Sequence, residues 1–125
     1  MATKNRVKAR SRARDSRGRS PQLSKTKLRA LIEEATVDAY NESEQAVGFF
    51  TMIEDNLELP FQTEVLGIVV TVEAVDLTDD DQIVAVCRRG DKRQRIPILD
   101  LPLPTPPPRG AEWISAYRGW QRGQY

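Results

Sequence analysis

Apolar residues recur at helical spacing in two stretches of the first half of the chain. In the first stretch, which Ser24 can cap, this spacing predicts a helix from Lys25 to about Tyr40. Acids and other polar residues occupy the opposite side of this helix. Its buried face would consist of Leu28, Leu31, Ile32, Ala35 and Ala39.

A second helix is predicted from Glu44 to Asn56, with Asn41 or Ser43 as its N-cap. Gly48 lies inside this helix, where glycine costs about 1 kcal/mol relative to alanine. We therefore expect the backbone of the first helix to approach Gly48 closely. The inward face of the second helix would consist of Val47, Phe50, Ile53 and Leu57.

From residue 61 onward the helical spacing gives way to runs of β-branched residues. Gly67 would form a bulge or a bend, and residues 78–81 and 89–91 would form turns. Pro97 requires an edge position or the end of a strand, because it has no N–H to donate. Strands are predicted around Val65 and over residues 68–77, 83–88 and 93–98.

A proline-rich segment, residues 101–108, separates the strands from a last short helix over residues 111–120. Polyproline II geometry would make the segment a stiff connector, although a Pro-x-x-Pro-x-Arg pattern ending at Arg109 also fits an SH3 ligand. Three aromatic residues of the last helix would pack on the sheet: Trp113, Tyr117 and Trp120. The prediction is an α+β fold with two N-terminal helices packed on a small antiparallel three- to four-stranded sheet or partial barrel, followed by a short C-terminal helix.

The charges of the chain are segregated, although 19 Lys and Arg nearly balance 18 Asp and Glu. Residues 1–29 hold 11 basic residues and one acid, whereas residues 30–87 hold 14 acids and no Lys or Arg. Residues 1–22 carry few apolar side chains, so we expect a disordered basic tail before a single domain, residues 23–125. The tail would engage nucleic acid or another polyanion, only solubilise the chain, or lie on its acidic body.

The rarest residue types exclude several classes of function. Without histidine, the chain has no Ser-His-Asp or Cys-His catalysis and no metal site with a histidine ligand. Its one cysteine, Cys87, excludes an internal disulfide, which suits a reducing compartment. No apolar stretch is long enough to span a membrane. We expect a cytoplasmic, monomeric protein that is not an enzyme, has no membrane partner and offers oxygen ligands to metals.

Two groups of carboxylates on the predicted helices lack a neighbouring lysine or arginine. Glu34, Asp38 and Glu42 follow one another at i, i+4 spacing, which would stack like charges on the first helix. Glu54 and Asp55 lie in the last turn of the second helix, where negative charge opposes the helix dipole. Calcium would relieve both arrangements, because it takes six to eight oxygen ligands in irregular geometry. A solvated acidic face is the alternative.

A third acidic group lies at the predicted turn that follows the long strand. This segment lacks the glycine and the closing glutamate of an EF-hand loop, so an acidic turn is favoured over a weak surface cation site. Its members are Asp76, Asp79, Asp80 and Asp81.

A distinctive segment, VDAYNESEQAVG at residues 37–48, is followed by EDNL at residues 54–57 and PF at residues 60–61. It resembles the CcbP-like cyanobacterial calcium-binding protein family. The resemblance implies a small α+β protein that binds Ca²⁺ through surface carboxylates without an EF-hand, as an intracellular buffer or sensor. The alternative is a small binding module whose basic tail engages nucleic acid or an anionic partner.

The same resemblance implies a set of metal ligands among the matched acids. Asp38 and Asp55 would be the first direct ligands, followed by Glu42 and Glu54, while Glu44 would serve as a ligand or only as a helix cap. Weaker candidates, which the motif does not cover, are Asp76, Asp79, Asp80 and Asp81.

Overall fold

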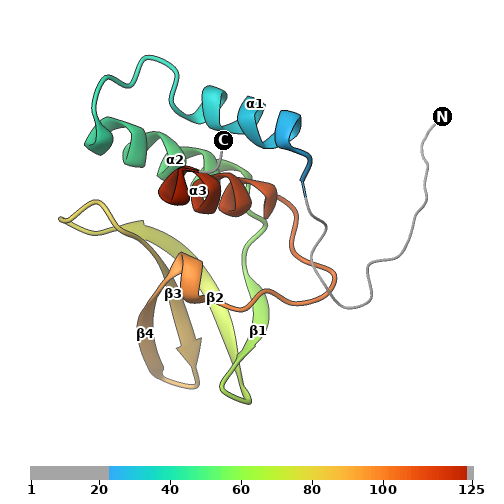
Figure 1. Ribbon diagram of the computed structural model, residues 1–125. Coiled ribbons are helices and arrows are strands. Elements are labelled where there is room, and N and C mark those ends of the chain that lie inside the picture. Colours follow the sequence, from blue (N-terminus) through green and yellow to red (C-terminus); the bar gives the residue numbers. More distant parts are fainter. Residues whose placement is uncertain (1–22, 124–125) are drawn as a thin grey trace.

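Three helices lie on one side of a four-stranded sheet in the computed structural model, which describes residues 23–123 (Figure 1). The predicted basic tail, residues 1–22, lies outside the described residues. None of the described helices is long and apolar enough to cross a lipid bilayer. The elements in chain order are α1 (Lys25–Ala35), α2 (Glu42–Asn56), β1 (Phe61–Val65), β2 (Ile68–Leu77), β3 (Ile83–Arg89), β4 (Lys92–Pro97), the 3-10 helix η1 (Ile98–Asp100) and α3 (Glu112–Arg122).

The sheet has the strand order β1-β2-β3-β4, and each neighbouring pair is antiparallel. It is an open meander, which confirms the predicted antiparallel sheet and shows four strands. Pro97 ends β4, an edge strand, as expected for a residue without an N–H. Gly67 lies in the two-residue turn between β1 and β2 and not in a bulge. The bulge lies at Glu73, where the register shifts between Val72 and Ala74.

Helix α1 is shorter than predicted, because it ends at Ala35 and not near Tyr40. The backbone N–H and the hydroxyl of Thr36 both donate to Ile32 O, at 3.0 and 2.8 Å, and close the last turn. The carbonyl of Ala35 faces α2 at Gly48, where an added Cβ would lie 2.0 Å from Ala35 O. The expected close approach at Gly48 is therefore confirmed, and it coincides with the end of α1.

Ile53 of α2 and Leu57 after it are buried as predicted, and α2 also buries Ala46 and Phe49. Val47 is 44% exposed, so its predicted inward position is wrong. Phe49 faces the aromatic residues of α3. The ring of Phe49 lies 5.7 Å from that of Tyr117 and 5.2 Å from that of Trp120, measured between centroids. Tyr117 and Trp120 thus pack on α2. Trp113 and Tyr117 also belong to the buried cluster that includes sheet residues such as Val72 and Ile83.

The core lies between the helices and the sheet, and every layer contributes to it. Burial of each large apolar side chain contributes about 1.5–3 kcal/mol to folding. The proline-rich connector runs from η1 to α3 and is tied to the sheet, because the hydroxyl of Thr63 in β1 donates to Pro102 O at 2.6 Å. The largest fully buried side chains are Phe49, Ile53, Val72, Ile83 and Ile98.

Candidate functional site

The start of α2 is held by a reciprocal pair of side-chain hydrogen bonds. Asn41 is the N-cap, and its Oδ1 accepts from the backbone N–H of Glu44 at 2.8 Å. One carboxylate oxygen of Glu44 accepts from the backbone N–H of Tyr40 at 2.7 Å. Glu44 therefore has a capping role. Glu42, in the first turn, makes no such contact among residues 23–123 and projects its carboxylate from the end of the helix.

The loop between β2 and β3 is equally well defined by its own hydrogen bonds. Thr78 N–H donates to Gln82 O at 2.9 Å, and Gln82 N–H donates to the Thr78 hydroxyl at 3.0 Å. Asp81 donates from its N–H to Thr78 O and adopts a left-handed conformation, with φ of 64°. Within this short loop the chain therefore presents Asp80 and Asp81 on a rigid support.

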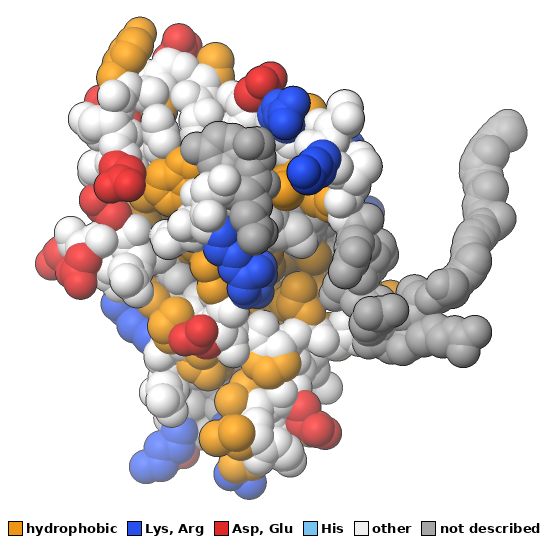
Figure 2. All heavy atoms as spheres, in the orientation of Figure 1, with side chains coloured by type: hydrophobic (Ala, Val, Ile, Leu, Met, Phe, Trp, Pro, Cys, Tyr) orange, Lys and Arg blue, Asp and Glu red, His pale blue; other side chains and the backbone are white. Residues whose placement is uncertain are grey.

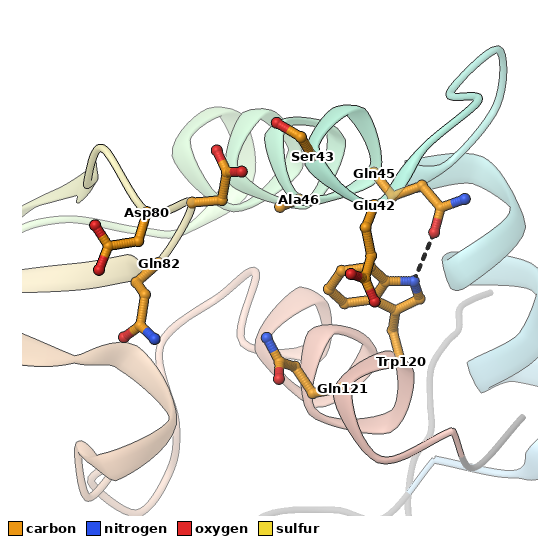
Figure 3. A pocket seen from close by; sticks show the side chains of 9 residues that line it. Glu42, Ser43, Gln45, Ala46, Asp80, Gln82, Trp120 and Gln121 are labelled. Carbon is orange, nitrogen blue, oxygen red and sulfur yellow. Dashed lines mark hydrogen bonds between the residues drawn. The ribbon is translucent and has the colours of Figure 1, made fainter.

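A cleft of about 400 Å³ separates the first turn of α2 from the β2–β3 loop, and α3 closes its base. Figure 3 shows Glu42 and Asp80 on opposite sides of this cleft, with Gln121 of α3 between them at the base. The indole N–H of Trp120 donates to Gln45 Oε1 at 2.9 Å and fixes the wall next to Glu42. The lining residues are Glu42, Ser43, Gln45, Ala46, Asp80, Asp81, Gln82, Trp120 and Gln121.

The lining of this cleft is rich in oxygen and carries negative charge only. Three carboxylates line it, and the amides of Gln82 and Gln121 add neutral oxygens. The amide nitrogen of Gln121 donates to the Tyr117 hydroxyl at 3.1 Å, which leaves its oxygen available. Of the described residues, no lysine or arginine lines the cleft. Figure 2 shows acidic side chains gathered on this side of the molecule, which carries the α1–α2 loop and the β2–β3 turn.

The cleft is not a preassembled coordination shell. Nowhere in residues 23–123 do three acidic or cysteine side chains converge closely enough to hold a metal ion. An ion in the cleft would require small movements of the carboxylates or bridging waters. This donor set of carboxylates and amide oxygens fits Ca²⁺, which accepts irregular oxygen shells, better than Mg²⁺, which demands octahedral geometry.

The predicted ladder of Glu34, Asp38 and Glu42 does not exist on one helix. Because α1 ends at Ala35, Asp38 lies in the α1–α2 loop and Glu42 belongs to α2. Asp38 has a φ of 61°, a conformation that aspartate tolerates better than most residues, and it lies at the same end of α2 as the cleft. It does not line the cleft itself.

Glu54 and Asp55 lie at the opposite end of α2 from Glu42. At 1.5 Å per residue, the 12 residues from Glu42 to Glu54 span about 18 Å along the helix axis. Two ligands of one calcium ion lie within about 5 Å of each other, because each lies about 2.3–2.6 Å from the ion. The five acids of the matched motif therefore cannot form one site. Any ion bound at Glu54 and Asp55 would occupy a separate, exposed position.

The remaining acidic candidates differ in what they contact. Asp76 pairs with Arg95 at 2.8 Å, so a guanidinium group already compensates its charge. Asp79 is exposed and does not line the cleft. Glu73, at the bulge, accepts hydrogen bonds from Arg93 and Arg88, which hold the pKa of its carboxyl below the usual value of 4.5. Only Asp80 and Asp81 of the third acidic group thus reach the cleft.

Several lining residues carry no signal in the sequence. Ser43, Gln82 and Gln121 are ordinary polar residues, and Trp120 looks like a core aromatic residue. They meet only because the β2–β3 turn and α3 fold against the start of α2. The one usable hint is that residues 30–87 contain no basic residue, which leaves Glu42, Asp80 and Asp81 without ionic partners nearby in the chain.

Comparison with known proteins identifies the family of the chain and a solved structure of similar fold. The family model Calci_bind_CcbP, described as "Calcium binding", matches residues 29–121. A solved structure described as "Calcium binding protein in the calcium-binding form" is similar in fold, with a TM-score of 0.60 and 19% sequence identity. That similarity covers 78% of this chain and 91% of the other. No curated protein matches the sequence.

Proposed function

The chain belongs to the CcbP family of calcium-binding proteins, and we propose that it binds Ca²⁺ in the cleft between α2, the β2–β3 loop and α3. We propose further that it acts in the cytoplasm as a calcium buffer or sensor. The observation that carries this proposal is the presence of carboxylates on both walls of one cleft that no cationic side chain lines.

Three carboxylates would hold the ion: Glu42 from α2, and Asp80 and Asp81 from the β2–β3 loop. The amide oxygens of Gln82 and Gln121 would complete the shell together with waters, which calcium retains in many sites. Like charges facing each other across the cleft repel in the free protein. Calcium would remove that repulsion, and this difference favours the bound state.

Asp38 is a further candidate at the same end of α2, four residues before Glu42. Glu54 and Asp55 remain predicted ligands of a separate ion at the opposite end. The cleft remains the main candidate site, because it brings carboxylates from two distant parts of the chain to one place.

The choice between buffer and sensor depends on whether the two walls move when the ion binds. Ligands on α2 and on the β2–β3 loop would be drawn toward one ion, so we propose that binding closes the cleft. Trp120 lines the cleft and contacts Gln45, so its fluorescence should respond to closure. A calcium-dependent change in Trp120 emission, lost in Trp120→Phe, would favour a sensor. Binding without such a change would favour a buffer.

The decisive experiment is titration calorimetry with CaCl₂ on a matched pair of variants, Glu42→Gln and Glu54→Gln. Both variants remove one negative charge from an exposed position of α2. Loss of a direct ligand at Glu42 should weaken calcium affinity at least tenfold, or about 1.4 kcal/mol. Glu54 lies about 18 Å away along the helix, beyond the Debye length of about 8 Å at physiological salt. Its variant should keep the wild-type affinity within about twofold.

Two outcomes separate failure of the cleft from failure of calcium binding. If Glu54→Gln or Asp55→Asn weakens binding and Glu42→Gln does not, the ion binds at the other end of α2. Calcium at 100 times its dissociation constant should stabilise the protein by about 2.7 kcal/mol, and a chelator should reverse this gain. A melting temperature that does not respond to millimolar calcium would contradict calcium binding altogether.

A further inference from the structure

The end of the sheet opposite the cleft carries an apolar trough. The strands form a meander, so the β1–β2 turn and the β3–β4 turn lie at the same end of the sheet (Figure 1). A trough of about 380 Å³ lies between these two hairpins. It includes the half-buried Val70 and Ile96, which the helices do not cover completely. Its apolar lining consists of Val65, Leu66, Ile68, Val70, Cys87 and Ile96.

Leu66 at the rim of this trough is unusual in both exposure and backbone conformation. Its side chain is 96% exposed, and its φ is 51°. Gly67 has a φ of 79°, so both residues of the two-residue turn have a positive φ. Turns of this kind favour Asn-Gly or Asp-Gly, and a branched apolar side chain is disfavoured there. The turn thus holds an apolar side chain in solvent at the expense of local stability, which points to a contact outside the chain.

Ile68, which lines the trough, extends the exposed apolar surface beyond Leu66. It is 42% exposed, and Val69, on the opposite face of β2, is 53% exposed. Figure 2 shows hydrophobic side chains between basic ones at the lower end of the molecule, where the hairpins turn. Exposed apolar residues that cluster in this way commonly mark an interaction site.

The rim of the trough is basic. Four cations line it, and no acid of the described residues does. Arg88 and Arg93 pair with Glu73. Among residues 23–123, Arg89 and Lys92 have no ionic partner, and Asp91 in the turn between them is the only acid in a segment, residues 88–95, that holds five basic residues. The trough therefore combines an apolar floor with uncompensated positive charge.

We propose that this trough binds an acidic amphipathic segment of a partner protein. Apolar side chains of the segment would fill the trough beside Leu66 and Ile68, and its carboxylates would pair with Arg89 and Lys92. The chain's own N-terminal part does not suit this place, because residues 1–29 hold 11 basic residues and one acid. A lipid surface fits less well, because side chains can enter a concave trough and a bilayer cannot.

The test uses two designed 16-residue peptides, both with leucine at positions i, i+3, i+4 and i+7. One carries glutamate on its polar face and the other carries lysine. Binding of each labelled peptide to the full chain is followed by fluorescence anisotropy, and the contact is located by ¹⁵N NMR. The acidic peptide should bind and shift the resonances of Val65, Ile68 and Ile96, and the basic peptide should not bind.

Three variants separate the apolar contribution, the charge and the fold. Arg89→Glu/Lys92→Glu should weaken binding of the acidic peptide at least tenfold. Lys25→Glu/Lys27→Glu, with the same change in net charge on exposed positions of α1, should leave it unchanged. Leu66→Asn should weaken binding severalfold and leave the melting temperature unchanged or raised, because Asn-Gly suits this turn. A melting curve shows that each variant is folded.

Several results would overturn the proposal. Acidic-peptide binding that is insensitive to Arg89→Glu/Lys92→Glu, or shifts located elsewhere, would exclude the trough. Self-association of the chain alone in sedimentation velocity, abolished by the same variant, would make a second copy the occupant. Binding to phosphatidylcholine vesicles with 30% phosphatidylserine, without binding to the acidic peptide, would assign the surface to lipid.

Discussion

The contact between α1 and α2 at Gly48 predicts opposite effects for the same substitution at two helical glycines. In Gly48→Ala, the new Cβ would lie 2.0 Å from Ala35 O, a backbone atom that cannot rotate away. In Gly119→Ala on α3, the nearest atom is Leu28 Cδ2 at 3.0 Å, the end of a flexible side chain. The two substitutions thus share their chemistry and differ in what the methyl group meets.

The expected free energies follow from this difference. Replacing glycine by alanine inside a helix contributes about 1 kcal/mol of stability through backbone propensity. Overpacking costs about 1–3 kcal/mol. Gly48→Ala belongs at the upper end, because the Cβ–oxygen distance must grow from 2.0 Å to at least 3.4 Å to become an ordinary contact. We expect Gly48→Ala to lower stability by about 2 kcal/mol, which corresponds to about 8–16 °C in Tm for a domain of this size. Gly119→Ala should stay within about 1 kcal/mol of wild type.

The measurement is urea unfolding and thermal melting of the three proteins, followed by far-UV circular dichroism in the absence of calcium. If Gly48→Ala is as stable as wild type, α1 does not end against α2 at this point. The position assigned to the α1–α2 loop, and with it that of Asp38, would then be wrong. Equal loss of stability in both variants would instead indicate that the helical layer tolerates no added volume.

Two further predictions concern charge. Arg93 and Arg88 lower the pKa of Glu73 in the folded state, so the stabilisation they provide is present above the unfolded value near 4.5 and is lost as the pH falls through the lower folded pKa. Glu73→Gln should therefore be less stable than wild type in urea at pH 7, and a difference that persists undiminished at pH 3 would contradict this assignment. Deletion of residues 1–22 removes eight basic residues and one acid, so the truncated chain should bind calcium more tightly at low salt and equally at high salt. Equal calorimetric affinities at low salt would exclude any competition between the tail and the ion.

Local patterns predicted the elements of this fold well. The strands begin and end close to the predicted positions, because β-branched runs and turn residues act over a few neighbouring residues. The N-cap at Ser24 and the close approach at Gly48 also followed from residue type alone. The end of α1 could not be predicted in this way. It depends on the contact of the Ala35 carbonyl with α2, which residue spacing does not encode.

The candidate site was less predictable than the fold. The motif at residues 37–48 predicted ligands at the start of α2, and Glu42 does line the cleft. The prediction that Glu34, Asp38 and Glu42 stack on one helix was wrong, because it assumed a helix from Lys25 to Tyr40. Asp80 and Asp81 were only weaker candidate ligands in the sequence. Nothing in a short acidic turn indicates that the turn will face the start of a helix almost 40 residues earlier.

By itself, the sequence determined the order and type of the elements, the restriction to oxygen ligands and the separation of acidic from basic segments. These properties depend on composition and short-range spacing, so they need no knowledge of the fold. Only the tertiary structure decided which acids share a cleft, which are paired with arginine, and which lie some 18 Å away along one helix. Those outcomes depend on how α3 and the β2–β3 turn pack against α2, and packing joins residues that are far apart in the chain.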